Sequence, residues 1–350
     1  MRFLSLSLAA ALSITPTVCL AAGGGGATGA EQPKPVPGFD VANLDKNCKP
    51  CDDFNKYANG GWIAANPVPA EYPSWGTFQR LRDQSLNDLR SILDEAAQGK
   101  ADKGTNEQKI GDYYYSVLDT KTRDAAGIKP LAPWLDRIDA IKDARSLQDT
   151  IAHLQTYNID AAFGVGSFPD FRNASMNVVF AGQGGLGLPE RDYYLKDDEK
   201  SKGIRAEYVA HVTRVFQLMG VDAAKAAEHA RTVMAMETRL AGASLTNTEL
   251  RDPSKSDNML DAAGRKTLTP NFDWERYFTN VGLPGIGQAN IAHPKFFAEL
   301  DKMLVEVPVE QWKTYLRWRL VDNMADTLST AFDTENFNFN AKFLSGTKEQ

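Results

Sequence analysis

The chain has 350 residues, of which 43% are hydrophobic and 24% are charged, the proportions of an ordinary globular protein. This length is enough for one large domain or two modest ones. The formal net charge of −6 and the lack of basic clusters exclude the electrostatic footprint of a nucleic-acid-binding protein, so we expect no nucleic-acid partner.

Residues 1–22 have the composition of a signal peptide. Arg2 supplies the positive start, an uncharged apolar stretch follows, and the small residues Ala21 and Ala22 offer a cleavage site. The apolar stretch is too short to span a bilayer as a mature helix. We therefore predict an exported protein, periplasmic or secreted, which meets the membrane only through its transient signal peptide.

Residues 23–38 are rich in Gly, Ala and Pro and have no apolar periodicity, which predicts a flexible linker. Order is expected to begin near Phe39. We therefore predict a single domain over residues 39–350.

Export changes what the cysteines indicate. Cys19 leaves with the signal peptide, so Cys48 and Cys51 remain in a C-x-x-C spacing, and an oxidising compartment makes both candidates for a structural disulfide. A thiol oxidoreductase would need a readily formed thiolate, which the neighbouring Asp52 and Asp53 disfavour. A zinc site would need two further ligands, and no second Cys/His pair lies nearby in the sequence.

Apolar residues recur at helical spacing along most of the chain. The stripe that begins at Phe78 predicts a helix over residues 77–97, with Gly99 as a stop signal. Ser146 and Asp149 resemble a capping box at the start of a helix over residues 146–157. Further stripes predict helices over residues 110–118, 204–219, 223–240 and 304–328.

Only residues 161–168 and 175–180 have a strand-like composition, and residues 170–173 between them favour a turn. The predicted fold class is therefore mainly α, a multi-helix domain with one small β-hairpin. The glycine-rich residues 182–187 superficially resemble a nucleotide-binding loop, but they lack its strand-to-helix context and are more typical of a turn.

The histidines and serines give no catalytic motif. None of His153, His211, His229 and His293 has the H-E-x-x-H, H-x-x-x-H or H-x-H spacing that brings two imidazoles to one metal ion. No G-x-S-x-G motif follows a strand. We therefore predict no catalytic residue, no metal ligand and no bound cofactor in this chain.

Several short motifs stand in a fixed order. The first is C-D-D-F-N-K-Y-A-N-G-G-W at residues 51–62, followed by N-P-V-P at 66–69 and W-G-T-F at 75–78. The second is G-L-P-E-R-D-Y-Y at 187–194, the third is R-D-P at 251–253, and the fourth is W-R-L at 318–320. Together they resemble the neprilysin and endothelin-converting-enzyme family of zinc metallopeptidases, from about Phe39 to the end of the chain.

The resemblance implies an endopeptidase that cuts peptides, in which a thermolysin-like lobe faces a helical lobe across a cleft. Its chemistry is that of a zinc-bound water activated by a glutamate on an H-E-x-x-H helix. The zinc ligands and this glutamate lie in the family's carboxyl-terminal half. The resemblance thus predicts a truncated amino-terminal lobe of a two-lobed metallopeptidase, inactive by itself, with zinc and the catalytic domain present only in the full-length enzyme. Residues 39–75 are expected to pack on that missing domain.

Two departures from the family concern possible site residues. Ser74 and Gln79 match the positions at which mammalian neprilysin has an Arg and an Asp that bind the terminal carboxylate of the substrate. They are our substrate-binding candidates, although neither can form that charged clamp. The family also pairs the cysteine at Cys51 with one near its carboxyl terminus, so Cys51 is here either unpaired or joined to Cys48.

A second hypothesis is a self-standing exported helical module that binds peptides or a protein partner without catalysis. The apolar run of Phe337, Phe339, Phe343 and Leu344 near the end of the chain argues against it, because no closing element follows to cover these side chains. We therefore favour the peptidase fragment.

Overall fold

The structure is a computed structural model that describes residues 40–350. The chain divides into two compact units, the first ending at Pro67 and the second spanning Val68–Gln350. The predicted signal peptide (1–22) and linker (23–38) lie outside the described residues. The division falls within residues 39–75, the segment that we expect to pack on another domain, and that packing stays a prediction.

The described part of the smaller unit contains the short turn η1 (Val41–Asn43) and one helix, α1 (Phe54–Ala65). Asp53 caps α1 by accepting a hydrogen bond of 2.9 Å from the Lys56 N–H. A Cβ atom at Gly61 would lie 2.2 Å from the Ala42 carbonyl oxygen. The glycines of the first motif therefore permit close packing between α1 and η1.

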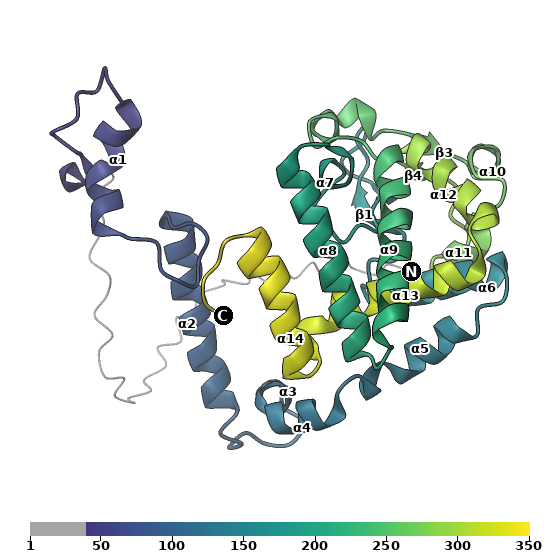
Figure 1. Cartoon of the computed structure of the whole chain (residues 1–350), viewed down its shortest axis with the longest axis horizontal. Coiled ribbons are helices and arrows are strands. Elements are labelled where there is room, and N and C mark those ends of the chain that lie inside the picture. Colours follow the sequence, from purple (N-terminus) through teal and green to yellow (C-terminus); the bar gives the residue numbers. More distant parts are fainter. Residues whose placement is uncertain (1–39) are drawn as a thin grey trace, which may run out of the picture. The chain divides into compact units, whose positions relative to one another are not determined.

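The larger unit is mainly helical, as predicted, and Figure 1 gives the arrangement of its elements. Its helices are α2 (Thr77–Ala96), α3 (Asn106–Leu118), α4 (Thr120–Ala126), α5 (Ala132–Asp139), α6 (Ala144–Gln155), α7 (Asp192–Leu195), α8 (Glu199–Leu218), α9 (Ala223–Ala243), α10 (Ala262–Leu268), α11 (Trp274–Asn280), α12 (Pro294–Glu306), α13 (Val309–Met324) and α14 (Thr330–Asn336). Shorter turns are η2 (Lys129–Leu131), η3 (Glu249–Arg251), η4 (Pro253–Lys255), η5 (Ala325–Thr327) and the π-helical η6 (Phe337–Leu344).

A small sheet lies among these helices. Its strands are β1 (Phe163–Pro169), β2 (Asn177–Gln183), β3 (Met259–Leu260) and β4 (Ala289–Ile291), in the order β1-β2-β4-β3. The antiparallel β1–β2 pair is the predicted hairpin, while β4 joins β2 in parallel and β3 joins β4 antiparallel. Strands of two and three residues are too short to give a period-two pattern, so the sequence did not reveal β3 and β4.

The centre of the larger unit is formed by α8, α9 and α13. Helices α8 and α9 run side by side (Figure 1), and the fully buried Ala226 and Ala230 of α9 permit this close approach. The largest buried side chains include Trp312 and Trp318 of α13 and Tyr208 of α8. The apolar stripes that predicted these helices are therefore their core-facing sides.

Two predicted helix boundaries are wrong. Helix α6 begins at Ala144, and its capping box consists of Asp143 and Ser146, with Asp143 Oδ1 accepting from the Ser146 N–H at 2.8 Å. The expected partner Asp149 instead binds Arg276 at 2.6 Å. The helix expected over residues 304–328 is divided, because Pro308 stands as the cap between α12 and α13 and has no N–H to continue a helix.

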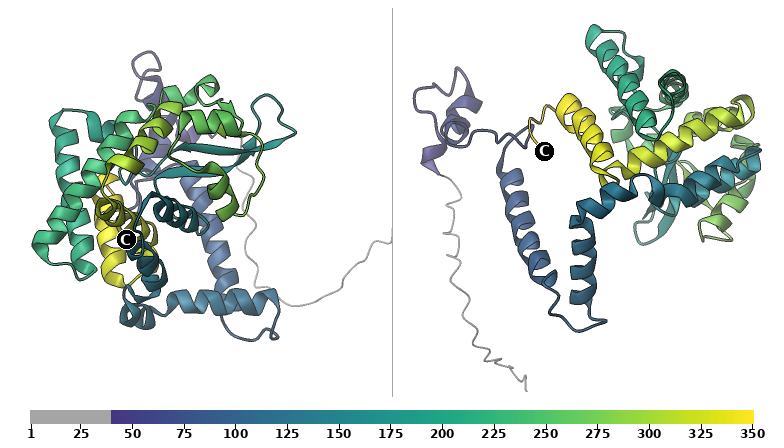
Figure 2. Two further views of the ribbon diagram at one scale, coloured as in Figure 1. Left: turned by 90° about the vertical axis from the view of Figure 1, so that its right-hand side faces the viewer. Right: turned by 60° about the horizontal axis from the view of Figure 1, so that its bottom comes forward.

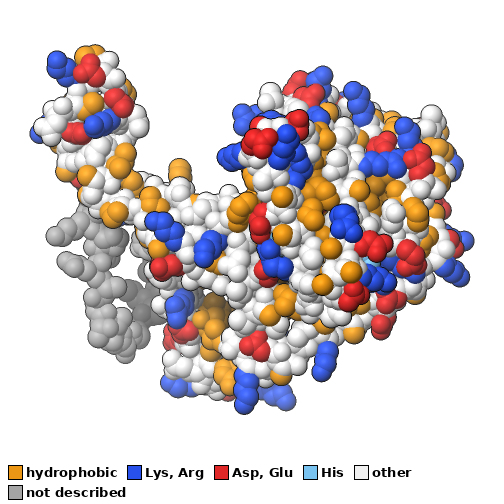
Figure 3. All heavy atoms as spheres, in the orientation of Figure 1, with side chains coloured by type: hydrophobic (Ala, Val, Ile, Leu, Met, Phe, Trp, Pro, Cys, Tyr) orange, Lys and Arg blue, Asp and Glu red, His pale blue; other side chains and the backbone are white. Residues whose placement is uncertain are grey.

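Helices α2 and α3 form a pair that stands out from the rest of the larger unit in the right view of Figure 2. They meet at Gly111, where a Cβ atom would lie 2.2 Å from the Ala96 carbonyl oxygen. On the face seen in Figure 3, positive and negative side chains are interspersed with apolar ones. None of the helices within residues 40–350 is long and apolar enough to cross a bilayer.

Candidate functional site

The second and fourth motifs meet at a buried carboxylate. Glu237 of α9 is fully buried, and its Oε2 accepts 2.7 Å hydrogen bonds from the hydroxyls of Tyr194 and Tyr208. The indole N–H of Trp318 donates to Glu237 Oε1 at 3.2 Å. The Leu188 N–H in turn donates to the Tyr194 oxygen at 2.8 Å. Burial raises the pKa of Glu237 to about 7.

The loop that carries the second motif packs tightly against this cluster. A Cβ atom at Gly187 would lie 2.0 Å from the Tyr208 hydroxyl oxygen, so the glycine of the second motif permits its loop to approach α8. Tyr315 also fixes the loop, because its hydroxyl donates to the Gly185 carbonyl at 2.7 Å. The two motifs therefore hold the loop to the helical core.

The four histidines do not gather at one place. His211 Nδ1 lies 2.8 Å from Glu335 Oε1, and its ring stacks on Phe339. His153 lies edge-on to Tyr157. Within residues 40–350 no three His, Cys, Asp or Glu side chains are placed to hold a metal ion.

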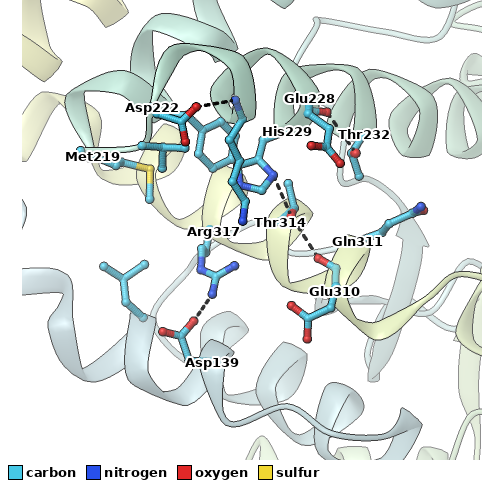
Figure 4. Close-up of a pocket in the computed structure, with 15 residues that line it drawn as sticks. Asp139, Met219, Asp222, Glu228, His229, Thr232, Glu310, Gln311, Thr314 and Arg317 are labelled. Atoms are coloured by element: carbon cyan, nitrogen blue, oxygen red, sulfur yellow. Dashed lines mark hydrogen bonds and ion pairs between the residues drawn. The ribbon is translucent and has the colours of Figure 1, made fainter.

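His229 lies in a polar hollow of about 720 Å³ between α5, α9 and α13 (Figure 4). Its Nδ1 is 3.3 Å from Thr314 Oγ1, and burial together with the nearby Lys225 lowers the pKa of His229. Arg317 forms an ion pair with Asp139 across the hollow. His229 is the one histidine among the residues that line this hollow.

The structure brings the two substrate-binding candidates together at the start of α2. Gln79 lies in the first turn, and its Nε2 donates to Ser74 Oγ at 3.5 Å. Their loop is held by Tyr72, whose hydroxyl donates to Asp83 and whose ring packs 4.9 Å from that of Trp75. The pair offers neutral donors and acceptors, so it suits a peptide backbone better than a carboxylate.

Next to this pair, α2 and α3 expose apolar side chains at helical spacing. Phe78 is 85% exposed, and the remaining stripe of α2 is also exposed at Leu81, Leu86, Leu89 and Ile92. On α3 the exposed set is Ile110, Tyr113, Tyr115, Val117 and Leu118. Within the larger unit, Val68–Gln350, the stripe that predicted α2 therefore has no covering element, unlike the stripes of α8 and α9. Apolar surface of this extent is typical of an interaction face.

The two cysteines are free thiols in the structure. Cys48 Sγ lies 3.5 Å from the Asp53 carbonyl oxygen, and Cys51 is exposed with its Sγ 3.7 Å from Asp52 Oδ1. The two sulfurs contact different acceptors, and a disulfide between Cys48 and Cys51 stays a prediction. The pairing of Cys51 with a distant cysteine, which the resemblance implies, stays a prediction.

Sequence reasoning missed an apolar hollow beside the hairpin. It has a volume of about 850 Å³ and lies between the β1–β2 hairpin and residues 250–256, with His293 and Ser256 among its lining residues. The third motif contributes Pro253 to one wall, but the other walls come from separate parts of the chain, so no single motif predicts the hollow.

Comparison with known proteins identifies the family. The family model of peptidase family M13, in its amino-terminal part, matches residues 50–350. Endothelin-converting enzyme 1 of Bos taurus is 26% identical over 348 residues, covering 96% of this chain and 44% of its own length. Neprilysin-3 of Drosophila melanogaster is 27% identical over 314 residues, covering 83% of this chain and 40% of its own length.

Solved structures give the same result. The inhibitor complex of the Mycobacterium tuberculosis zinc metalloprotease ZMP1 superposes with a TM-score of 0.84 at 31% identity, covering 89% of this chain and 48% of that one. PepO of Lactobacillus rhamnosis shares the fold with a TM-score of 0.72 at 17% identity, covering 86% of this chain and 48% of that one. This chain spans less than half the length of these relatives. It belongs to peptidase family M13.

Proposed function

We propose that this chain is the amino-terminal, cleft-forming part of an exported zinc metalloendopeptidase that cleaves peptides, and that a segment outside the chain supplies the catalytic domain. The observation that carries the proposal is the uncovered apolar stripe of α2 and α3. An exposed apolar face of this extent is typical of a surface that another domain or partner covers. The printed names of the relatives, zinc metalloprotease and endothelin-converting enzyme, support the activity.

The family implies one zinc ion, and the residues of this chain do not fit it. Residues 40–350 present no cluster of three possible ligands, and His229 and His293 each stand apart from other imidazoles. The proposed contribution of this chain is therefore to bind and orient the peptide, while zinc and the water it activates belong to the missing domain.

In this proposal Ser74 and Gln79 bind the peptide at the start of α2. Their hydroxyl and amide groups pair with backbone N–H and C=O groups and carry no charge to attract a free carboxylate. The enzyme is thus expected to accept peptides whether or not the carboxyl end is free. Its proposed location, periplasmic or secreted, rests on the composition of residues 1–22.

The test is hydrolysis of an internally quenched peptide by two purified proteins, the full-length gene product and this chain. We expect cleavage by the full-length protein, loss of cleavage with a chelator, recovery with added zinc, and no cleavage by this chain. Chelator-sensitive cleavage by this chain would overturn the division of roles. An inactive full-length protein that still binds peptides would favour the non-catalytic binding module.

A further inference from the structure

Strand β1 is an edge of the sheet, with β2 on one side and no strand of residues 40–350 on the other. The Asp170 N–H donates to the Met176 carbonyl at 2.8 Å, which marks this opposed pair as hydrogen-bonded. Antiparallel pairs alternate between bonded and non-bonded, so the N–H and C=O groups of Val165 and Ser167 point away from β2.

The neighbouring contacts agree with this alternation. On β2, the Ala181 carbonyl points away from β1 and accepts from the Ala292 N–H at 2.9 Å. On β1, the Phe163 carbonyl accepts a hydrogen bond of 2.7 Å from Gln155 Nε2, and Pro169 has no N–H to donate. These residues limit the free edge to Val165 and Ser167, whose outward N–H and C=O groups have no partner among the described residues.

Gly166 lies between the two free positions, where a Cβ atom would lie 3.0 Å from the Phe168 ring, and Gly164 precedes them. Gly164 and Gly166 share the face of β1 that carries Phe168. A Cβ atom at Gly164 would find its nearest neighbour, a backbone oxygen, at 3.8 Å, so no side chain fills the space. Glycine within a strand often marks a place where another backbone approaches closely.

On this face lies the apolar hollow of about 850 Å³, within the size range of ligand pockets. Phe168, Phe180 and Leu250 line it, and Phe168 is 53% exposed. The ion pair between Arg172 Nε and Asp257 Oδ2, at 3.0 Å, ties the hairpin tip to the segment on the other side. In the left view of Figure 2 the hairpin projects from the helical body.

The floor of the hollow is polar and uncharged. His293 Nδ1 accepts the Gln183 N–H at 2.8 Å, so the ring hydrogen lies on Nε2, 3.2 Å from Ser256 Oγ. Burial lowers the pKa of His293 to about 4. This tautomer donates to the serine and cannot take its proton, which excludes an activated nucleophile. The Ser256 hydroxyl hydrogen has no acceptor within residues 40–350 and is left for a ligand.

A second hollow, of about 590 Å³, lies on the opposite face of the hairpin. Val165, Ser167 and Val179 line it together with Leu283 and Ile286. Successive side chains of a strand point to opposite faces, so a peptide laid beside β1 would direct alternate side chains toward the two hollows.

We propose that the free edge of β1 and these two hollows form a peptide-binding site, separate from Ser74 and Gln79, that takes an extended segment with apolar side chains. The inference deepens the proposed function, on which it rests for the peptide nature of the ligand. An extended backbone is the partner that matches N–H and C=O groups two residues apart, and the uncharged His293 and Ser256 suit an apolar side chain.

The probe is a fluorescently labelled peptide of about nine residues, the length of a long strand, with apolar side chains in its middle for both hollows and glutamines at its two ends for solubility. Binding to this chain is measured by fluorescence anisotropy. A failure to bind this peptide can therefore be told apart from a failure of the full-length protein to cleave peptides. Two further peptides carry N-methyl groups on every second amide. In one peptide the odd-numbered amides are methylated, and in the other the even-numbered amides. Only one set faces β1, so we expect one methylated peptide to bind about tenfold or more weakly and the other to keep its affinity.

Two substitutions complete the test. Ser167→Pro removes an outward N–H without touching the β1–β2 ladder and is expected to weaken binding about tenfold, while Ser167→Ala keeps the N–H and the affinity. Equal binding of the two methylated peptides, or no binding up to about 1 mM, would overturn the proposal. So would concentration-dependent dimerisation abolished by Ser167→Pro, because the edge would then pair with a second copy.

Discussion

Tyr194 donates a hydrogen bond of 2.7 Å to the buried carboxylate of Glu237, which joins the second sequence motif to α9. Trp318, from the fourth motif, donates to the other carboxylate oxygen at 3.2 Å. Two of the segments that resemble the peptidase family therefore converge on one buried acid. In this structure the two segments contribute to the packing of the helical unit.

Removing the Tyr194 hydroxyl tests this packing role. Tyr194→Phe leaves the Leu188 N–H without its acceptor and takes one donor from Glu237, so we expect the free energy of unfolding to fall by about 1–3 kcal/mol. The adjacent Tyr193→Phe is the matched control and should change it by less than about 0.5 kcal/mol. Chemical denaturation of this chain measures both, and equal effects of the two substitutions would contradict the role.

The raised pKa of Glu237 predicts a pH dependence of stability. The folded protein keeps this proton up to about pH 7, while the unfolded chain releases it near the ordinary value of 4.5. The unfolded state therefore binds fewer protons between these values, and rising pH costs stability, by up to about 3 kcal/mol. Glu237→Gln should remove this slope. The test is to measure the free energy of unfolding of the unchanged protein and of Glu237→Gln at several pH values between 4.5 and 8. Parallel pH profiles would rule out the contribution of Glu237.

Two glycines should respond oppositely to alanine. A Cβ atom at Gly187 would meet the Tyr208 hydroxyl at 2.0 Å, so Gly187→Ala should destabilise the fold by about 1–3 kcal/mol. Gly203 lies within α8 with open space around it, so Gly203→Ala should stabilise by up to about 1 kcal/mol. Thermal unfolding of both variants tests the pair, and a harmless Gly187→Ala would disprove the close approach.

The exposed stripe of α2 should matter only in the full-length enzyme. Phe78→Ser is expected to leave the stability of this chain within about 0.5 kcal/mol, because the side chain is exposed. In the full-length protein it should lower stability or peptidase activity, because the covering surface loses its contact. Arg90→Ser, an exposed change on the same helix, is the control. An unchanged full-length Phe78→Ser protein would count against a covering lobe.

Because Ser74 and Gln79 are uncharged, a charge introduced at either position should change the preference for a free or an amidated peptide carboxyl end. Ser74→Arg places a cation beside Gln79 and is expected to favour peptides with a free carboxyl end over their amides by about tenfold. Gln79→Glu is the opposite control and should disfavour the free carboxylate. The ratio of kcat/KM for a peptide and its amide, in the full-length enzyme, measures the effect. Ratios that do not move in either variant would place the peptide elsewhere.

Much of the fold could be predicted because long apolar stripes fix helices without tertiary help. The stripe at Phe78 gave α2 nearly to its ends, while the stripe at Tyr208 gave the end of α8 within one residue but missed its first five residues. The wrong helix boundaries arose where a neighbouring residue ended or capped the helix instead of the expected one. Pro308 ended a predicted helix, and Asp143 capped α6 in place of Ser146, because the aspartate already met the Ser146 N–H from three residues earlier.

The site could be predicted only in part. Ser74 and Gln79 lie together because Gln79, in the first turn of α2, donates back to Ser74 in the preceding loop, and their role in binding a substrate stays a prediction. The hollow beside β1 was out of reach, because it depends on Leu250 and His293 meeting a hairpin far away in sequence. The sequence also could not show that the stripe of α2 lacks a covering element while that of α8 is buried, since the two patterns are alike.

The most direct measurement is the size of the native protein in exported fractions of the source cells, detected with an antibody to this chain. A band about twice the 38.5 kDa of this chain is predicted, because the chain covers only 44% and 48% of two relatives. A band slightly below 38.5 kDa would contradict it. Signal removal would then have produced a free-standing protein, and the helical unit would act without a catalytic partner.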